Sequence, residues 1–204
     1  MTVSADQDIR VQTITADGMR EALAGTPLAS WADVFVRLAD QYGIDRNWII
    51  SYLRWETGFG SAGPGGRHPS MGFNDPWDLL CGTPDSACSG EWPGAVCTRA
   101  PNLYCYQAFP TMEAGIEAGY QNWGSYVARG WTTWFTSLSV ALCGKPAGCA
   151  GQWVQNVIAQ GQQNEARWPI GTPQPQPSAI SPVLVFGVIL VGAGAALLLS
   201  RGGA

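Results

Sequence analysis

The sequence predicts a mainly α-helical domain with a small irregular second lobe stapled by disulfides, followed by one C-terminal transmembrane helix. Three observations lead to this fold class. Apolar residues recur at helical spacing through much of residues 28–168. Cysteines gather in a stretch rich in Pro and Gly, and an uncharged apolar run occupies residues 180–200. A chain of 204 residues has room for one such domain with a core of its own.

The composition excludes one class of partner. Only 13% of the residues are charged, the formal net charge is -4 and the sequence pI is about 4.8. A protein that binds nucleic acid needs a basic surface, and the sequence has no basic tract, so we expect no nucleic-acid partner. Aromatic rings are common stacking platforms for sugars, but we assign most of the 10 tryptophans to the core.

Residues 1–27 carry no clear prediction. Ile9, Val11 and Ile14 indicate a short extended segment at most. A secretory signal would show a positively charged region followed by an apolar one, and the segment lacks this pattern.

From residue 28 onward the apolar spacing predicts a series of helices. The first ends at Gly43, and the second begins at the N-cap Asp45 and ends at Gly58. Residues 60–105 are too rich in Pro, Gly and Cys for helix, so we expect an irregular lobe with a short hairpin there. The helices are expected at residues 28–42, 46–57, 112–127, 134–142 and 153–158, and the hairpin strands at 95–98 and 103–106.

The chain has six cysteines and one histidine, His68. It has no C-x-x-C spacing and no histidine pair, so we expect no metal site. An even number of cysteines in loops favours disulfides and an oxidising compartment. Six cysteines allow about 15 connectivities, and because short loops close most easily we expect neighbours to pair. The expected disulfides are Cys81 with Cys88, Cys97 with Cys105, and Cys143 with Cys149.

The end of the chain predicts a membrane anchor. Residues 169–179 are rich in Pro and Gln and should form an extended linker. Residues 180–200 form an uncharged helix long enough to cross the lipid bilayer, at about 1.5 Å per residue. Arg201 lies in the short tail 201–204, which places the tail inside and the folded domain outside the membrane.

One carboxylate stands out, at the end of the predicted helix 46–57. Glu56 shares an apolar helix face with Tyr52 and Leu53. Burial against this face and the negative end of the helix dipole both raise the pKa of the carboxyl group. An acid that stays protonated near neutral pH is what cleavage of a glycosidic bond requires, because the leaving oxygen must receive a proton. The alternative is an ordinary exposed glutamate at a helix end.

Three segments, within residues 31–168, resemble one superfamily. Residues 56–60 read ETGFG and resemble the E-[ST]-G-[FW] signature of the lysozyme-like superfamily, in particular lytic transglycosylases and bacterial glucosaminidases. Residues 72–79, GFNDPWDL, are similar to the N-N-P-[FW]-G-I segment, and residues 106–116, YQAFPTMEAGI, resemble the F-x-x-[YF]-x-[ST]-x-E-E-G element. The chain departs from the family at Asp78, where the second motif has Gly.

The resemblance implies a lysozyme-like catalytic domain over residues 28–168 that acts on the glycan strands of peptidoglycan without a cofactor. Glu56 would be the catalytic residue, and four residues would line the substrate groove: Phe59, Asn74, Trp77 and Tyr106. Of these, Asn74 and Tyr106 would hydrogen-bond the reacting sugar. The alternative for Phe59 and Trp77 is a place in the core.

The predicted reaction is that of a lytic transglycosylase, because the sequence offers no convincing second carboxylate. We interpret Asp75, Asp78, Asp85 and Glu91 as solvated loop residues. The resemblance implies that one glutamate protonates the bridging oxygen and then deprotonates the sugar's C6 hydroxyl, while the substrate's N-acetyl group stabilises the cationic carbon. The alternatives are a glucosaminidase or muramidase that uses water, and a non-catalytic glycan-binding membrane protein.

Disulfides, a membrane anchor, no secretory signal and a cell-wall motif together suggest a context. They fit an enzyme anchored in the lipid membrane of a phage virion, which opens the host cell wall at infection. A bacterial envelope protein is the alternative.

Overall fold

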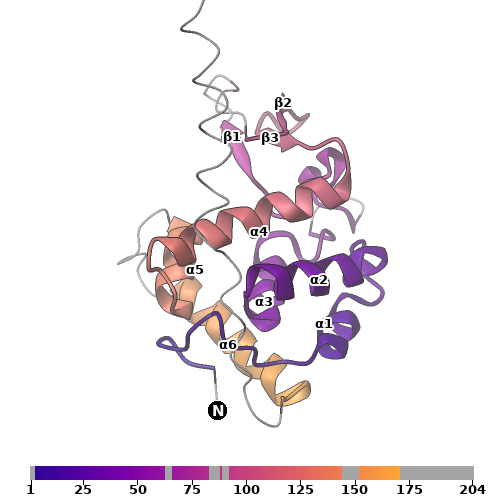
Figure 1. Ribbon diagram of the computed structural model, residues 1–204. Coiled ribbons are helices and arrows are strands. Elements are labelled where there is room, and N and C mark those ends of the chain that lie inside the picture. The colour runs from indigo at the N-terminus through magenta and orange to yellow at the C-terminus, as the bar shows by residue number, and fades with distance from the viewer. Residues whose placement is uncertain (1–2, 63–65, 83–87, 89–91, 144–151, 171–204) are drawn as a thin grey trace, which may run out of the picture.

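The computed structural model describes residues 3–62, 66–82, 88, 92–143 and 152–170, and Figure 1 shows the arrangement of the elements. The elements are α1 (Ala16–Leu23), η1 (Ala29–Trp31), α2 (Ala32–Tyr42), α3 (Arg46–Thr57), η3 (Pro69–Phe73), β1 (Leu80–Gly82), β2 (Val96–Arg99), β3 (Cys105–Ala108), α4 (Met112–Ala128), α5 (Trp134–Cys143) and α6 (Gln152–Arg167). The three strands gather at one end of the molecule, and α4 runs between them and the other helices (Figure 1). The predicted mainly helical fold is confirmed, and the rest of its regular structure is a small three-stranded sheet.

The predicted helix boundaries follow from their caps. Gly43 is the C-cap residue after α2 and Gly58 is the one after α3, and both are in the left-handed conformation. α3 begins at Asp45, whose carboxylate accepts the backbone N–H of Asn47, and α4 begins at Thr111, whose hydroxyl accepts the N–H of Ala114.

The core is built largely from aromatic side chains around α3. The ring of Trp48 stacks on that of Tyr52 at 5.4 Å between centroids, and its indole N–H donates to the hydroxyl of Ser137 on α5. Aromatic side chains bury about 150–250 Å² each, so a small core gains much from them. The largest fully buried side chains include Trp48, Trp77, Trp123, Trp134, Tyr120 and Phe35.

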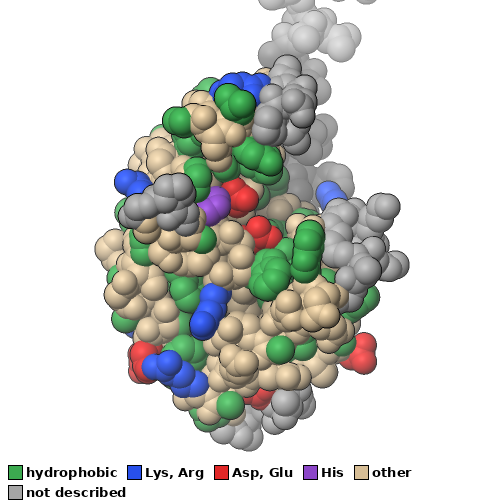
Figure 2. All heavy atoms as spheres, turned by 180° about the vertical axis from the view of Figure 1, so that it is seen from behind, with side chains coloured by type: hydrophobic (Ala, Val, Ile, Leu, Met, Phe, Trp, Pro, Cys, Tyr) green, Lys and Arg blue, Asp and Glu red, His purple; other side chains and the backbone are tan. Residues whose placement is uncertain are grey.

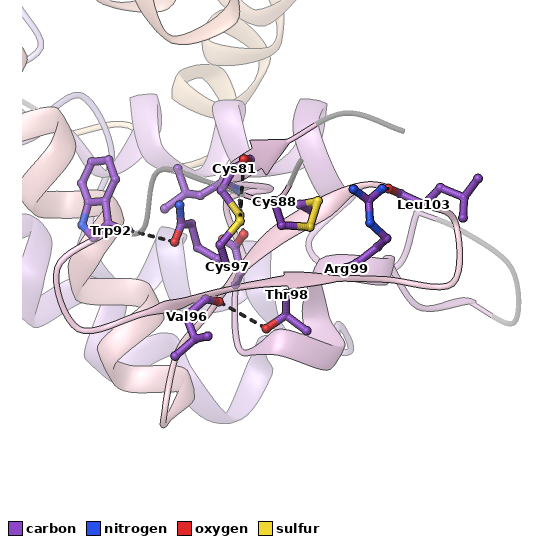
Figure 3. Close-up of a disulfide and its surroundings, with 12 residues drawn as sticks. Cys81, Cys88, Trp92, Val96, Cys97, Thr98, Arg99 and Leu103 are labelled. Atoms are coloured by element: carbon purple, nitrogen blue, oxygen red, sulfur yellow. Dashed lines mark hydrogen bonds between the residues drawn. A yellow bond between two sulfur atoms is a disulfide. The ribbon is translucent and has the colours of Figure 1, made fainter. Parts of the chain in front are cut away.

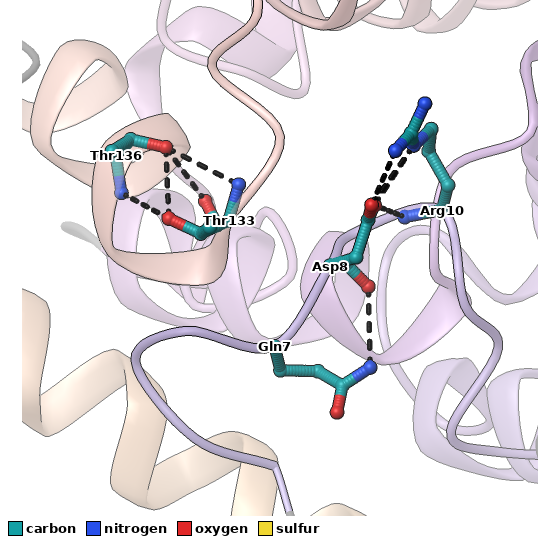
Figure 4. Close-up of polar contacts among 5 residues, drawn as sticks. All are labelled: Gln7, Asp8, Arg10, Thr133 and Thr136. Atoms are coloured by element: carbon teal, nitrogen blue, oxygen red, sulfur yellow. Dashed lines mark hydrogen bonds and ion pairs between the residues drawn. The ribbon is translucent and has the colours of Figure 1, made fainter.

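The N-terminal segment, which had no clear prediction, belongs to the domain. Val3, Ile9 and Ile14 are buried in the main core. The N–H of Ile9 donates to the carbonyl of Thr132, just before α5, and Figure 4 shows the two segments close together. Ile14 forms a β-bridge with Pro169, so the domain includes the first residue of the predicted linker.

The sheet confirms the predicted hairpin and corrects the predicted disulfides. Strand order is β1-β3-β2, with β3 antiparallel to both neighbours. The observed bonds are Cys81–Cys97, which joins β1 to β2, and Cys88–Cys105 (Figure 3). The predicted pairs Cys81 with Cys88 and Cys97 with Cys105 are therefore wrong.

Loop length was too weak a guide to the pairing. Lengthening a closed loop from 7 to 16 residues costs only about 0.7 kcal/mol in chain entropy, which strand pairing readily outweighs. The third predicted pair, Cys143 with Cys149, lies outside the described residues.

Within the described ranges, we find no helix that combines the length and the apolar character needed to span a membrane. Most of the predicted linker, the predicted span 180–200 and the tail 201–204 lie outside those ranges.

Candidate active site

Glu56 is the penultimate residue of α3 and is partly buried. Burial, together with the neighbouring carboxylate of Asp78, raises the pKa of its carboxyl group to about 7. The predicted effect of burial on this acid is confirmed. The contribution of a second acidic group was not expected.

Thr57, the second residue of the ETGFG motif, joins the end of α3 to the loop that carries Asp78. Its side chain is buried, and its hydroxyl oxygen lies 3.2 Å from the carbonyl oxygens of Leu53 and Pro76. The same hydroxyl accepts the backbone N–H of Gly60. The motif therefore fixes the position of Glu56 relative to residues 74–79.

The loop 74–79 is fixed from within by Asp75. This side chain is fully buried, and its carboxylate accepts the backbone N–H groups of Trp77 at 3.1 Å and Leu79 at 2.6 Å. Burial raises the pKa of Asp75 to about 8, although these hydrogen bonds act in the opposite direction. Because the two bonds lie on either side of Asp78, they hold its backbone in place.

Trp77 anchors the same loop in the core. Its indole N–H lies 3.0 and 3.1 Å from the carbonyl oxygens of Gly115 and Ile116 on α4. Gly119 makes room for the ring, since a Cβ at this position would lie 2.1 Å from it. Only 1% of Trp77 is exposed, so the predicted contact with substrate is wrong and the residue is part of the core.

Asp78 is held in an unusual conformation. Its φ of 60° lies in the left-handed region, which Asp tolerates better than most residues. Its Oδ1 atom is buried and makes no hydrogen bond to any residue that the structure describes. Burial raises its pKa to about 6. The expectation of a solvated side chain is therefore wrong for Asp75, whereas Asp78 is partly buried. Asp85 and Glu91 lie outside the described residues.

Tyr106 faces these carboxylates from β3. Its ring stacks on that of Phe73 at 5.6 Å, and its hydroxyl accepts a hydrogen bond from the amide of Asn102 at 2.8 Å. Burial raises the pKa of Tyr106, and the charges of Asp78 and Asp75 add to this rise. The structure thus brings Tyr106 close to the acidic group of the site.

The two remaining predicted groove residues lie at the borders of this region. The amide of Asn74 donates to the carbonyl of Phe109 at 2.9 Å, which ties the loop to the end of β3. Phe59 is partly buried and packs against the main core, with a φ of 57°. Both positions follow directly from the turns that end α3 and η3.

An aromatic cluster close to Tyr52 and Glu56 was not predicted from the sequence. The ring of Tyr126 contacts those of Trp123 and Trp131 at 5.2 and 5.5 Å, and the guanidinium of Arg129 lies over Trp131. Burial raises the pKa of Tyr52, and the charges of Glu56 and Tyr126 raise it further, which places all three in one neighbourhood. The aromatic spacing near the end of α4 was the available signal.

Figure 2 shows acidic side chains in a hollow of the surface, with the histidine on one side and hydrophobic side chains on the other. A pocket of about 430 Å³ adjoins Phe73; its lining is Arg67, His68, Pro69, Gly72, Phe73, Ala100, Pro101 and Asn102. The ring nitrogen Nδ1 of His68 accepts the N–H of Ser70, so this histidine caps η3.

One group of possible metal ligands occurs in the part of the chain that the structure describes. The sulfur atoms of Cys88, Cys97 and Cys105 lie within 4.8 Å of one another. All three belong to disulfides, so they offer no thiolate to a metal ion.

Comparison with known proteins identifies no relative: no family model, no curated protein and no solved structure matches the chain. The fold and the site define a mainly helical domain with a partly buried acid near the end of α3, close to a second acidic side chain.

Proposed function

We propose that this chain is a lysozyme-like enzyme that cleaves the glycan strands of peptidoglycan, with Glu56 as the proton donor. The observation that carries the proposal is the environment of this one side chain. It ends an apolar helix, is partly buried, and has a pKa raised to about 7. A carboxylic acid with such a pKa retains its proton near neutral pH and can give it to a leaving sugar oxygen.

The lytic transglycosylase reaction implied by the sequence motifs uses this acid twice. Glu56 first protonates the bridging oxygen, and the substrate's own N-acetyl group stabilises the cationic carbon. The carboxylate then removes the proton of the C6 hydroxyl, which closes an anhydro ring. In the hydrolytic route of the same superfamily, a water molecule replaces this hydroxyl. Both routes begin with the same proton transfer from Glu56.

The aromatic cluster suits a sugar substrate. Tyr106 is only 4% exposed and its hydroxyl accepts from Asn102, so it supports the site from within the fold. Trp131 is partly exposed next to Tyr126, and such rings stack well on the apolar faces of sugars. These features support a glycan rather than a charged polymer as the ligand.

The C-terminal sequence completes the proposal. An apolar helix at residues 180–200 would anchor the enzyme as a single-pass membrane protein, with the catalytic domain outside the membrane or exposed on a virion. Tethering would raise the local concentration of the enzyme at the wall without changing its chemistry.

The first prediction tests Glu56 directly. We expect Glu56→Gln to slow cleavage of purified peptidoglycan at least about 100-fold, because the amide has nearly the same shape but cannot donate the required proton. The assay uses the full chain in detergent, and a thermal melt checks that the variant is folded.

Asp17→Asn is the matched control. It also removes one negative charge, but the side chain of Asp17, on α1, is exposed. It should cleave at the rate of the unchanged chain. A folded Glu56→Gln variant that keeps more than a few per cent of the activity would exclude Glu56 as the acid. A wild-type chain that binds wall fragments without cutting them would favour the non-catalytic alternative.

A further inference from the structure

We propose that Asp78 is a second catalytic residue, which takes a proton from the water molecule that attacks the sugar, so that the enzyme is a hydrolase. This inference rests on the proposed role of Glu56 as the acid. The single-glutamate reaction was predicted because no second carboxylate was apparent in the sequence. The fold brings one to the site.

The first argument is the connection between the two carboxylates. Thr57 directly follows Glu56, and Pro76 lies two residues before Asp78. The hydroxyl oxygen of Thr57 is 3.2 Å from the carbonyl oxygen of Pro76. The end of α3 and the loop 74–79 are therefore joined next to both acids. The charge of Asp78 acts on Glu56, on Tyr52 and on Tyr106, so it reaches the whole site.

The second argument is that Asp78 is rigidly held. Asp75 binds the backbone N–H groups on both sides of it, and the indole of Trp77 is fixed to α4. A catalytic group must keep its geometry to well under 1 Å, and this loop supplies such support.

The third argument is the unsatisfied state of the carboxylate. Buried polar atoms nearly always have a hydrogen-bond partner, yet Oδ1 of Asp78 has none among the described residues. Its left-handed backbone also costs roughly 1 kcal/mol relative to glycine, the residue that the motif leads one to expect. Neither feature helps the fold. Both are explained if this carboxylate is kept for the reaction rather than for the fold.

The electrostatics of the pair agree with this division of roles. Burial raises the pKa of both carboxyl groups, and the charge of Asp78 adds to the rise at Glu56. An ionised Asp78 therefore favours a protonated Glu56, which is the arrangement that a base and an acid need. Pairs of carboxyl groups whose environments separate their pKa values are typical of glycoside hydrolases.

The proposed hydrolysis forms one bond and breaks another. The oxygen of the water molecule forms a bond with the anomeric carbon, and the bond from this carbon to the bridging oxygen breaks. The proton of Glu56 goes to the bridging oxygen, and one proton of the water goes to Asp78. After the products leave, Asp78 releases its proton to solvent and Glu56 regains one. The new chain end is a reducing sugar, one water heavier than an anhydro sugar.

The second prediction follows from this difference in product. Full-length protein in detergent is incubated with purified peptidoglycan, and the fragments are analysed by mass spectrometry before and after treatment with borohydride, which reduces only reducing ends. We expect the wild-type chain to give reducing ends. Asp78→Asn and Asp78→Gly should cleave about 10- to 100-fold more slowly, with a larger share of anhydro ends in the remaining product.

Asp78→Gly guards against misfolding, since glycine adopts a φ of 60° more readily than Asp, and its melting temperature should be no lower than that of the wild type. Asp17→Asn again controls for the loss of one charge. Anhydro ends from the wild-type chain would overturn the role of Asp78 and leave that of Glu56 intact. Unchanged rates and products in both Asp78 variants would also overturn it. If the wild-type chain does not cleave at all, the proposed function itself fails.

Discussion

Among the buried acids of this protein, hydrogen bonding rather than pKa separates structural side chains from candidate catalytic ones. Burial raises the pKa of Asp45 to about 7, as it does for Glu56. The carboxylate of Asp45, however, accepts from the backbone and hydroxyl of Thr13 and from the backbone of Asn47. Both carboxylate oxygens of Asp45 therefore form hydrogen bonds that connect the N-terminal segment to α3. A raised pKa therefore does not identify a reactive group unless the group also has free hydrogen-bonding capacity.

The acidity of Glu56 has a consequence for stability, which is the third prediction. Its pKa is about 7 in the folded chain against an ordinary value of 4.5, so the folded state binds more protons than the unfolded state between these values. The free energy of unfolding contributed by this group therefore falls as the pH rises through that window. We expect the stability of the wild-type chain to drop between pH 4.5 and pH 8.

Replacing Glu56 by glutamine should remove the contribution of this side chain to the fall in stability with pH. In Glu56→Gln, thermal or urea unfolding should depend less on pH, by about 3 kcal/mol at most over the same range. Asp17→Asn provides the baseline, since that side chain is exposed. Equal pH dependence in the wild type and in Glu56→Gln would show that Glu56 titrates as an ordinary exposed acid.

At the scale of elements, α4 is as important to the site as the helix that carries Glu56. Two of its glycines admit the loop 74–79: a Cβ at Gly115 would lie 1.7 Å from the carbonyl oxygen of Asn74, and one at Gly119 would meet the ring of Trp77. Glycine inside a helix costs about 1 kcal/mol relative to alanine, so these positions serve close packing at the expense of helix propensity.

The fourth prediction tests this packing. Gly119→Ala should destabilise the domain by roughly 1–3 kcal/mol, because the clash with Trp77 outweighs the gain in helix propensity. Cleavage should fall as well, since Trp77 positions the loop of Asp78. Gly72→Ala is the control: it has open space around its added Cβ and should be close to neutral in a thermal melt. A Gly119→Ala variant that is more stable than wild type would show that α4 does not constrain the loop.

Elements with long apolar faces could be predicted from the sequence, and the contacts between distant segments could not. The helices α2 to α6 follow from periodicity and caps, whereas the eight-residue α1 has too short a pattern to be recognised. Glu56 could be found because its own helix buries it. Asp78 could not, because its burial depends on Trp77 reaching a space that Gly119 leaves in α4. The disulfide pairing could not be predicted for the same reason, since Cys81 and Cys97 lie on the two strands that flank β3 and come together only in the folded sheet.

At the scale of the whole molecule, the two ends of the described chain meet. The backbone N–H of Val3 donates to the carboxylate of Glu165, and that of Thr15 donates to the carbonyl of Trp168. The amide of Asn164, on α6, donates to the side chains of Asn47 and Ser51 on α3. The helix that carries Glu56 is therefore held on one side by the last turns of α6, and the domain is closed only when the chain reaches about residue 169.

The fifth prediction uses this closure to separate domain from anchor. A chain that ends at residue 170 keeps the bridge between Ile14 and Pro169 and every core residue, so it should be soluble, folded and active on purified peptidoglycan. A chain that ends at residue 163 loses Asn164, whose amide donates to Asn47 and Ser51 of α3, and also loses Trp168, which packs against the core. We expect it to melt at least several degrees lower or to fail to fold.

The full chain should instead partition into detergent, because an uncharged apolar segment of the length of residues 180–200 gains far more from leaving water than its few polar groups lose. Phase partitioning and circular dichroism of the three chains measure these differences. If the chain ending at residue 170 is folded but inactive, residues beyond the domain take part in the reaction. If the full chain stays in the aqueous phase, residues 180–200 are not a membrane anchor, and the proposed tethering of the domain at the cell wall fails.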